Sequence, residues 1–222
     1  MAKLEPVLPD NRVAFVGRTG SGKTYLARAL LNDVDRLIVL DAKGTITGPE
    51  WRVEDFDGAS RALRNPDSEF RLRVPAPING DWEPFLWAAY EAENCTVYID
   101  EVYGVETGTK PSNALRACIT RGRELGIGVW AATQRPSQIP LIILSEADWI
   151  FTFQLRLDVD RKRMAELIGP AALDPLSGHN VVVYNDKLEK PVRYRSIVVR
   201  ESAKPTVSGA ETAIPEKGTA NV

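Results

Sequence analysis

Apolar residues occur in short continuous runs, and most runs are followed by a stretch in which apolar positions recur at helical spacing. Such runs predict buried strands, because a strand that is covered on both faces is apolar at nearly every position. They occupy residues 12–16, 37–40, 70–74, 96–99, 127–132 and 149–155. Helices are predicted after Gly22, over residues 83–93, from Pro111 and Ser112 to Leu125, and over residues 159–168.

This alternation predicts an α/β fold with a mostly parallel central sheet and helices on both faces. Residues 180–184 and 192–199 also have the pattern of strands, and their short connection predicts an antiparallel hairpin at the sheet edge near the C-terminus. Residues 1–200 are expected to form a single domain. Residues 201–222 are rich in Ala, Thr, Pro and Glu without hydrophobic periodicity, which predicts a disordered tail.

The charge of the chain is nearly balanced, with 28 basic and 30 acidic side chains and a net charge of −2. A protein that coats DNA nonspecifically is usually basic overall, so any DNA contact is expected to be local. No run of about 18 apolar residues and no apolar signal core occurs, so we expect no membrane span and a cytoplasmic location. Cys95 and Cys118 form no paired motif, and we expect both to be reduced thiols.

The sequence between the first strand and its helix, GRTGSGKT, fits the Walker A pattern in full. Its glycines allow the backbone to point its amides at phosphate oxygens, and the following helix adds a partial positive charge. Lys23 is predicted to reach the β- and γ-phosphates of ATP, and the Thr24 hydroxyl to bind Mg²⁺. The predicted nucleotide-binding residues are Gly17, Arg18, Thr19, Gly20, Ser21, Gly22, Lys23 and Thr24.

An acidic pair, Asp100 and Glu101, follows the strand predicted over residues 96–99. Two solvated acids at a strand end would be ordinary, but the Walker A motif upstream favours a Walker B motif. Asp100 is then predicted to hold magnesium through a water, and Glu101 to act as general base on the attacking water. The glutamate points to hydrolysis, because nucleotide kinases transfer phosphate to a substrate and need no water-activating residue there.

The elements predicted between the two motifs leave room for an extra strand between the motif strands, as in motor-type P-loop NTPases with a RecA/ASCE core. A polar side chain at the tip of a strand beside Walker B lies near the γ-phosphate. Gln134 is therefore a candidate sensor that hydrogen-bonds the phosphate and the lytic water. The alternative is that Thr133 and Gln134 only cap the strand end, which is the simpler interpretation of this segment alone.

Together these motifs resemble the FtsK/HerA superfamily of DNA-pumping ATPases. The resemblance is carried by GRTGSGKT from Gly17, YIDE from Tyr98 and GRELGIGVWAATQRPS from Gly122. The β-barrel domain of HerA and the membrane helices of FtsK do not fit in the residues before Gly17, so we expect a stand-alone motor core. The chain is most similar in this respect to the small viral genome-packaging ATPases.

The resemblance implies a homo-oligomeric ring of about five or six subunits that moves double-stranded DNA without reading its sequence. It names capsid vertex or portal proteins as candidate partners, and the host cytoplasm or the virion as the location. It also implies that Gln134 is the sensor and that Arg123, or Arg121, is an arginine finger. The alternatives are a motor of the same class in conjugation, secretion or phage assembly, and an ATP-dependent assembly switch that does not pump DNA.

Arg123 is the preferred finger, because it lies at the predicted end of the helix after Walker B and Arg121 should point elsewhere on that helix. A role for Arg123 as a helix C-cap is the alternative. The loop from Val102 to Asn113, which includes the Gly/Thr-rich stretch 104–110, is a candidate channel loop in which Lys110 contacts DNA phosphates, and a plain surface loop is the alternative. His179, the sole histidine, lies in a predicted turn, and no catalytic or metal role is expected for it.

Overall fold

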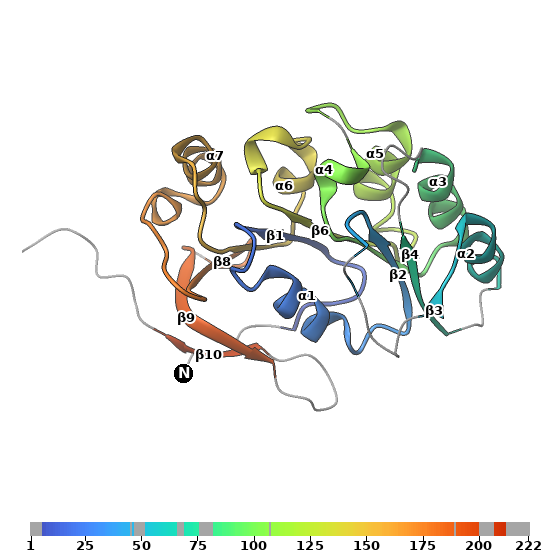
Figure 1. Cartoon of the computed structure of the whole chain (residues 1–222), viewed down its shortest axis with the longest axis horizontal. Helices are drawn as coiled ribbons and strands as arrows, with labels where there is room; N and C mark the ends of the chain where they lie inside the picture. The colour runs from blue at the N-terminus through green and yellow to red at the C-terminus, as the bar shows by residue number, and fades with distance from the viewer. Residues whose placement is uncertain are drawn as a thin grey trace, which may run out of the picture.

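The computed structural model of the chain describes residues 6–44, 46, 52–65, 69–75, 82–106, 108–188, 190–199 and 207–211. One central sheet runs through these residues, with strands in the order β10-β9-β8-β7-β1-β6-β5-β2-β4-β3 (Figure 1). The strands are β1 (Arg12–Val16), β2 (Arg36–Asp41), β3 (Arg52–Val53), β4 (Phe70–Pro75), β5 (Thr96–Ile99), β6 (Gly128–Thr133), β7 (Trp149–Thr152), β8 (Val181–Asn185), β9 (Val192–Val199) and β10 (Val207–Glu211). The helices are α1 (Lys23–Leu31), α2 (Phe56–Leu63), α3 (Glu83–Ala92), α4 (Val102–Val105), α5 (Asn113–Thr120), α6 (Ile142–Ser145) and α7 (Asp158–Ile168), with short 3-10 helices η1 (Pro136–Gln138) and η2 (Pro170–Ala172).

The strands from β7 to β3 pair in parallel, and β6 lies between β1 and β5. The predicted mostly parallel sheet is thus confirmed, and so is the extra strand between the two motif strands. β8 runs antiparallel to both β7 and β9, as the predicted C-terminal hairpin requires. Because the parallel strands end at one edge of the sheet, the segments that follow β1, β5 and β6 meet there.

Helices cover both faces of the sheet, as predicted, because alternate residues of the inner strands point to opposite sides. Figure 1 shows α1 below the sheet and α3, α5, α6 and α7 above it. The face toward α1 is aromatic: the ring of Phe15 stacks on that of Phe151 with centroids 5.3 Å apart, and Trp130 packs beside them. The opposite face is aliphatic and packs against the other helices, with Val97, Ile99 and Val129 at its centre. None of the described helices combines the length and apolar character needed to cross a membrane.

The helix after Walker B is shorter than predicted and ends at Thr120 instead of Leu125. Gly122 has a weak helix propensity, and its amide binds the carbonyl of Ala117, five residues back, which closes the helix. Arg123 therefore lies in the turn between α5 and β6 and not at a helix end. The loop predicted over residues 104–110 also differs, because the short helix α4 begins directly after Glu101.

Part of the region predicted to be a disordered tail forms β10, which pairs antiparallel with β9. An unpaired sheet edge offers a row of backbone donors and acceptors, and any extended segment that follows it closely can satisfy them. The prediction from composition did not include this backbone pairing. Residues 201–206 and 212–222 lie outside the described residues.

We predict that Gly128→Ala destabilises the fold, because β6 passes close to the segment before β1. A Cβ atom at Gly128 would lie 1.8 Å from the carbonyl oxygen of Pro9, so one of the two backbones must move. Overpacking of this kind costs about 1–3 kcal/mol of the free energy of unfolding, which denaturant titration measures. The control Glu124→Ala changes an exposed side chain nearby and should stay within about 0.5 kcal/mol of the parent. Equal stabilities of the two variants would contradict this account of the contact.

Candidate functional site

The Walker A loop leaves β1 and is fixed to the two neighbouring strands by backbone hydrogen bonds. The amide of Gly17 donates a 3.0 Å hydrogen bond to the carbonyl oxygen of Thr133, and the amide of Arg18 donates a 2.8 Å hydrogen bond to that of Gln154. A Cβ at Gly17 would lie 2.7 Å from that of Phe153, so only glycine fits this approach. Gly22 has φ +108°, a left-handed conformation that glycine adopts readily, and it turns the chain into α1. The loop therefore leads directly into the N-terminus of α1 at the tip of β1.

Lys23, the first residue of α1, is buried beneath the loop. Its Nζ donates to the carbonyl oxygens of Gly17 and Arg18 over 2.5 and 3.0 Å. Burial lowers the pKa of this ammonium to about 8, although the negative charges of Glu101 and Asp100 oppose the shift. Additional negative charge at the loop would therefore stabilise the protonated form.

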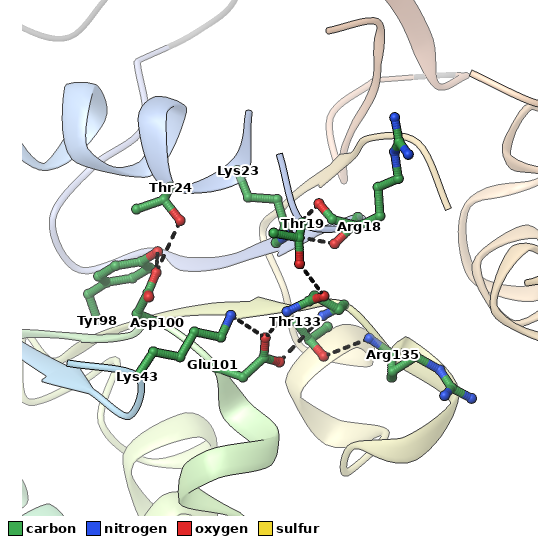
Figure 2. A network of polar contacts seen from close by, with 12 residues as sticks. Arg18, Thr19, Lys23, Thr24, Lys43, Tyr98, Asp100, Glu101, Thr133 and Arg135 are labelled. Atoms are coloured by element: carbon green, nitrogen blue, oxygen red, sulfur yellow. Dashed lines mark hydrogen bonds and ion pairs between the residues drawn. The ribbon is translucent and has the colours of Figure 1, made fainter. Parts of the chain in front are cut away.

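Thr24 and Asp100 face each other across the gap between α1 and the tip of β5 (Figure 2). The Thr24 hydroxyl donates to Oδ1 of Asp100 over 3.2 Å, and the buried Tyr98 hydroxyl donates to the same oxygen over 2.8 Å. Burial raises the pKa of the Asp100 carboxyl, and the hydrogen bond from Tyr98 opposes that shift. A cation at this carboxylate would favour its ionised form.

This pair of oxygens fits a magnesium ion. Mg²⁺ is a hard cation that binds nucleotides through one or two protein oxygens and takes its other ligands from phosphates and water. Thr24 and Asp100 supply such a pair beside the loop. No group of three or more His, Cys, Asp or Glu side chains in the described part of the chain is placed to hold a metal. The donor set therefore suits a metal that arrives with a polyphosphate better than a permanently held one.

Glu101 lies next to this pair and makes contacts with two other strand tips. Its Oε2 is 2.8 Å from Nζ of Lys43, which follows β2, and accepts a 2.9 Å hydrogen bond from Nε2 of Gln134, which follows β6. The Oε1 atom receives only the backbone amide of Gln134, over 3.4 Å. The Glu101 side chain is 11% exposed, and its two carboxylate oxygens are held unequally.

Gln134 connects this carboxylate to the Walker A loop. Its Oε1 accepts a 2.6 Å hydrogen bond from the Thr19 hydroxyl, while its amide nitrogen donates to Glu101. The residue after it, Arg135, forms an ion pair with the buried Asp160 at the start of α7. Gln134 is thus more than a strand cap in this structure, because both ends of its amide bind groups of the two predicted motifs.

A cavity of about 690 Å³ opens beside the loop, and its wall comes from both halves of the sheet. The charged side chains that line it are Lys23, Lys43 and Asp100. Tyr25, Phe153, His179, Ser196 and Ile197 also line it. His179, for which no role was predicted, lies with its Nδ1 3.3 Å from the carbonyl oxygen of Ser21. The turn before β8 therefore reaches the Walker A loop.

Arg121 and Arg123 lie away from this cluster. The segment that holds both arginines precedes β6, whereas the Walker A loop follows β1. Because β1 and β6 are parallel, the arginines lie at the N-terminal ends of the strands and the Walker A loop lies at their C-terminal ends. Arg123 forms an ion pair with Asp148 of the same chain, yet its side chain is 60% exposed. Arg121 is the exposed C-cap residue of α5. Neither arginine reaches the Walker A loop of its own chain. An arginine finger at either position would therefore have to act on the nucleotide of a neighbouring subunit.

Lys43 and Tyr98 are site residues for which the sequence predicted no role. Lys43 belongs to the segment LIVLDAKGT, whose end follows a buried strand next to β5. That position is the only sequence signal for it, because parallel neighbours end at the same edge. Tyr98 lies two residues before Asp100 on the aromatic face, and an apolar pattern does not distinguish its hydroxyl from a core side chain.

No protein-family model matches the chain. Among curated proteins, it is 28% identical over 178 residues to the DNA packaging ATPase P9 of Enterobacteria phage PRD1, which covers 74% of this chain and 73% of that protein. Among solved structures, it superposes on the genome packaging NTPase B204 of Sulfolobus turreted icosahedral virus 2 with a TM-score of 0.69 and 21% identity, over 86% of this chain and 100% of that one. The chain is similar to viral genome-packaging ATPases.

The resemblance predicted from the motifs is thereby confirmed, together with the P-loop NTPase fold. The fold is also shared with the pCW3 conjugation coupling protein TcpA, with a TM-score of 0.59 and 15% identity over 83% of this chain and 59% of that one. The similarity to packaging ATPases thus lies within a wider group of P-loop proteins.

Proposed function

We propose that the chain is an ATPase that moves double-stranded DNA into a viral capsid, without sequence preference, as part of a homo-oligomeric ring of about five or six subunits. The observation that carries the proposal is the convergence of Lys23, the Thr24–Asp100 pair and Glu101 at one edge of the sheet. The names of the relatives support it, since P9 is called a DNA packaging ATPase and B204 was solved with AMPPCP and ATPγS. Capsid vertex or portal proteins would be its partners, in the host cytoplasm or the virion.

Each part of the site has a role in phosphoryl transfer to water. The loop amides and Lys23 bind the oxygens of the β- and γ-phosphates. Thr24, and Asp100 through a water, would hold Mg²⁺, which would supply positive charge to the phosphates. Glu101 accepts a proton from the water that attacks the γ-phosphorus, while the bond to the bridging oxygen breaks and ADP and phosphate leave. Gln134, between Thr19 and Glu101, is placed to bind both the phosphate and that water.

The first test separates binding from hydrolysis. Lys23→Ala should lose ATP binding, because it removes the cation that contacts the ground-state phosphates. Glu101→Gln should keep ATP binding within a few-fold and lower kcat by about 10²-fold or more, because an amide cannot accept the water proton. A fluorescent ATP analogue measures the first effect and phosphate release the second. The matched control Glu124→Gln alters an exposed glutamate and should match the parent in both. Turnover by Glu101→Gln near the parent rate would remove Glu101 from the mechanism.

The ring component of the proposal depends on Arg123. Charge develops on the γ-phosphoryl oxygens in the transition state, and a guanidinium can bind two of these oxygens at once. Arg123 is exposed at the edge of the sheet opposite the Walker A loop, so a neighbouring subunit's nucleotide is the natural target in a head-to-tail ring. Its ion pair with Asp148 would have to open, or to orient it, when a neighbour binds.

Mixing two inactive proteins tests this arrangement. Lys23→Ala subunits retain Arg123, and Arg123→Ala subunits retain the nucleotide site, so a mixed ring contains complete composite sites. Arg123→Ala alone should lose about 10³-fold in kcat if an arginine finger acts, Lys23→Ala alone should not bind ATP, and the mixture should regain part of the ATPase activity. The corresponding mixture with Arg121→Ala in place of Arg123→Ala identifies which arginine acts. No recovery in mixed rings that are shown to contain both subunits would contradict a shared site.

The DNA component predicts a contact in the segment after Walker B. Lys110 is exposed there, about ten residues after Glu101, so the position of the segment can follow the state of the nucleotide. Lys110→Ala should lower stimulation of the ATPase by duplex DNA and leave the basal rate intact. Lys187→Ala, an exposed lysine in the turn between β8 and β9, should change neither. Unchanged stimulation in Lys110→Ala would exclude this loop as the contact.

A motor for conjugation, secretion or phage assembly is the second candidate, and the fold shared with TcpA favours it as the alternative. An ATP-dependent assembly switch is the third. The packaging motor and the motor for conjugation, secretion or phage assembly both require ATP turnover that DNA or another transported substrate stimulates. An assembly switch binds ATP without pumping. Stimulation by naked duplex DNA therefore separates the first candidate from the third.

A further inference from the structure

Lys43 is fixed beside Glu101 by a well-anchored turn. The turn follows β2, and Oδ2 of the buried Asp41 accepts hydrogen bonds from the amide of Ile46 and from Nε of Arg73, each over 2.9 Å. The helix α4 packs against the other side, where Gly104 has no side chain: a Cβ there would lie 2.6 Å from that of Ala42. The turn that carries Lys43 is therefore held between β4 and α4.

The contacts of the Glu101 carboxylate are unequal at its two oxygens. Oε2 receives both the Lys43 ammonium over 2.8 Å and the Gln134 side-chain amide over 2.9 Å. Oε1 receives only the Gln134 backbone amide at 3.4 Å, beyond the usual range of a good hydrogen bond. A general base needs one oxygen with a free lone pair in a fixed place, and this arrangement leaves Oε1 in that role.

We propose that Lys43 is a positioning residue for hydrolysis. It holds Oε2 of Glu101, together with Gln134, so that Oε1 accepts the proton of the attacking water. The inference rests on the proposed ATPase function and adds to it a residue from a third strand tip, outside both Walker motifs. Lys43 touches Glu101 and acts through it, so its loss should change the chemical step.

A different role for Lys43 would also fit its place in the cavity wall. Its side chain is 38% exposed and lines the cavity with Lys23, so its ammonium could contact a phosphate directly. The two roles differ in what they change. A phosphate contact contributes to the affinity for the nucleotide, whereas a positioning contact contributes to kcat and only while Glu101 is present.

The experiment measures kcat, KM and the Kd of a non-hydrolysable ATP analogue for Lys43→Ala, Lys43→Arg and Lys187→Ala. Loss of the contact should lower kcat of Lys43→Ala by about 10–100-fold, the size expected when a general base is misplaced. The Kd should stay within about three-fold of the parent, since the phosphates keep Lys23. Lys43→Arg should recover part of the loss, because a guanidinium also binds a carboxylate. Lys187→Ala should match the parent.

A double variant decides whether Lys43 acts through Glu101. Adding Lys43→Ala to Glu101→Gln should cause no further loss of kcat, because the group that Lys43 positions is already gone. A further loss as large as that in the parent background would overturn the proposal, and so would an unchanged or raised kcat in Lys43→Ala. A fall in affinity that accounts for the whole effect would assign Lys43 to the phosphates instead.

The same series distinguishes failure of this inference from failure of the proposed function. If Glu101→Gln is inactive and Lys43→Ala is fully active, Lys43 has no positioning role and the ATPase proposal stands. If the parent protein does not hydrolyse ATP, or Glu101→Gln hydrolyses it at the parent rate, both proposals are wrong.

Discussion

The geometry of the site depends on the contacts of the Glu101 carboxylate with Lys43 and Gln134. Glu101 follows β5, yet it binds Lys43 from the tip of β2 and Gln134 from the tip of β6, and Gln134 binds Thr19 in the Walker A loop. These contacts are possible because β6 lies between β1 and β5 and all of these strands end at one edge of the sheet. Gln134 thus connects the Walker A loop to Glu101 through a single amide side chain, and the next residue, Arg135, pairs with Asp160 of the helix α7.

Much of this arrangement could be predicted because it is encoded locally. The Walker A loop is a continuous segment, and the strands β1 and β5 are apolar after their first residues and buried at every position, so their ends mark the site without knowledge of the fold. The order of the strands placed Gln134 beside Glu101 once an inserted strand was inferred. The contacts of Lys43 and Tyr98 were not predictable in the same way, because each depends on the register of neighbouring strands and on which way a side chain turns.

The other differences have physical causes of the same kind. The helix α2, with the sequence FDGASRAL, was not predicted; it includes a glycine, and Asp55 caps it by accepting a hydrogen bond from the amide of Gly58. The strand β10 depends on pairing with an open edge and not on its own composition. The early end of α5 moves Arg123 into a turn, where Asp148 binds it. The cap of α2, the pairing of β10 with β9 and the turn that closes α5 depend on particular hydrogen bonds, which a hydrophobic pattern does not reveal.

The proposed function couples ATP hydrolysis to DNA, and the rate of ATP hydrolysis with and without long duplex DNA tests this coupling most directly. The measurement uses the unmodified protein at low and at moderate salt. The account predicts hydrolysis in the absence of DNA, a faster rate with duplex DNA of unrelated sequences, and weaker stimulation as salt rises, because the contacts are made to phosphates. A rate that is the same with and without DNA at both salt concentrations would contradict it and would favour a nucleotide-dependent assembly switch.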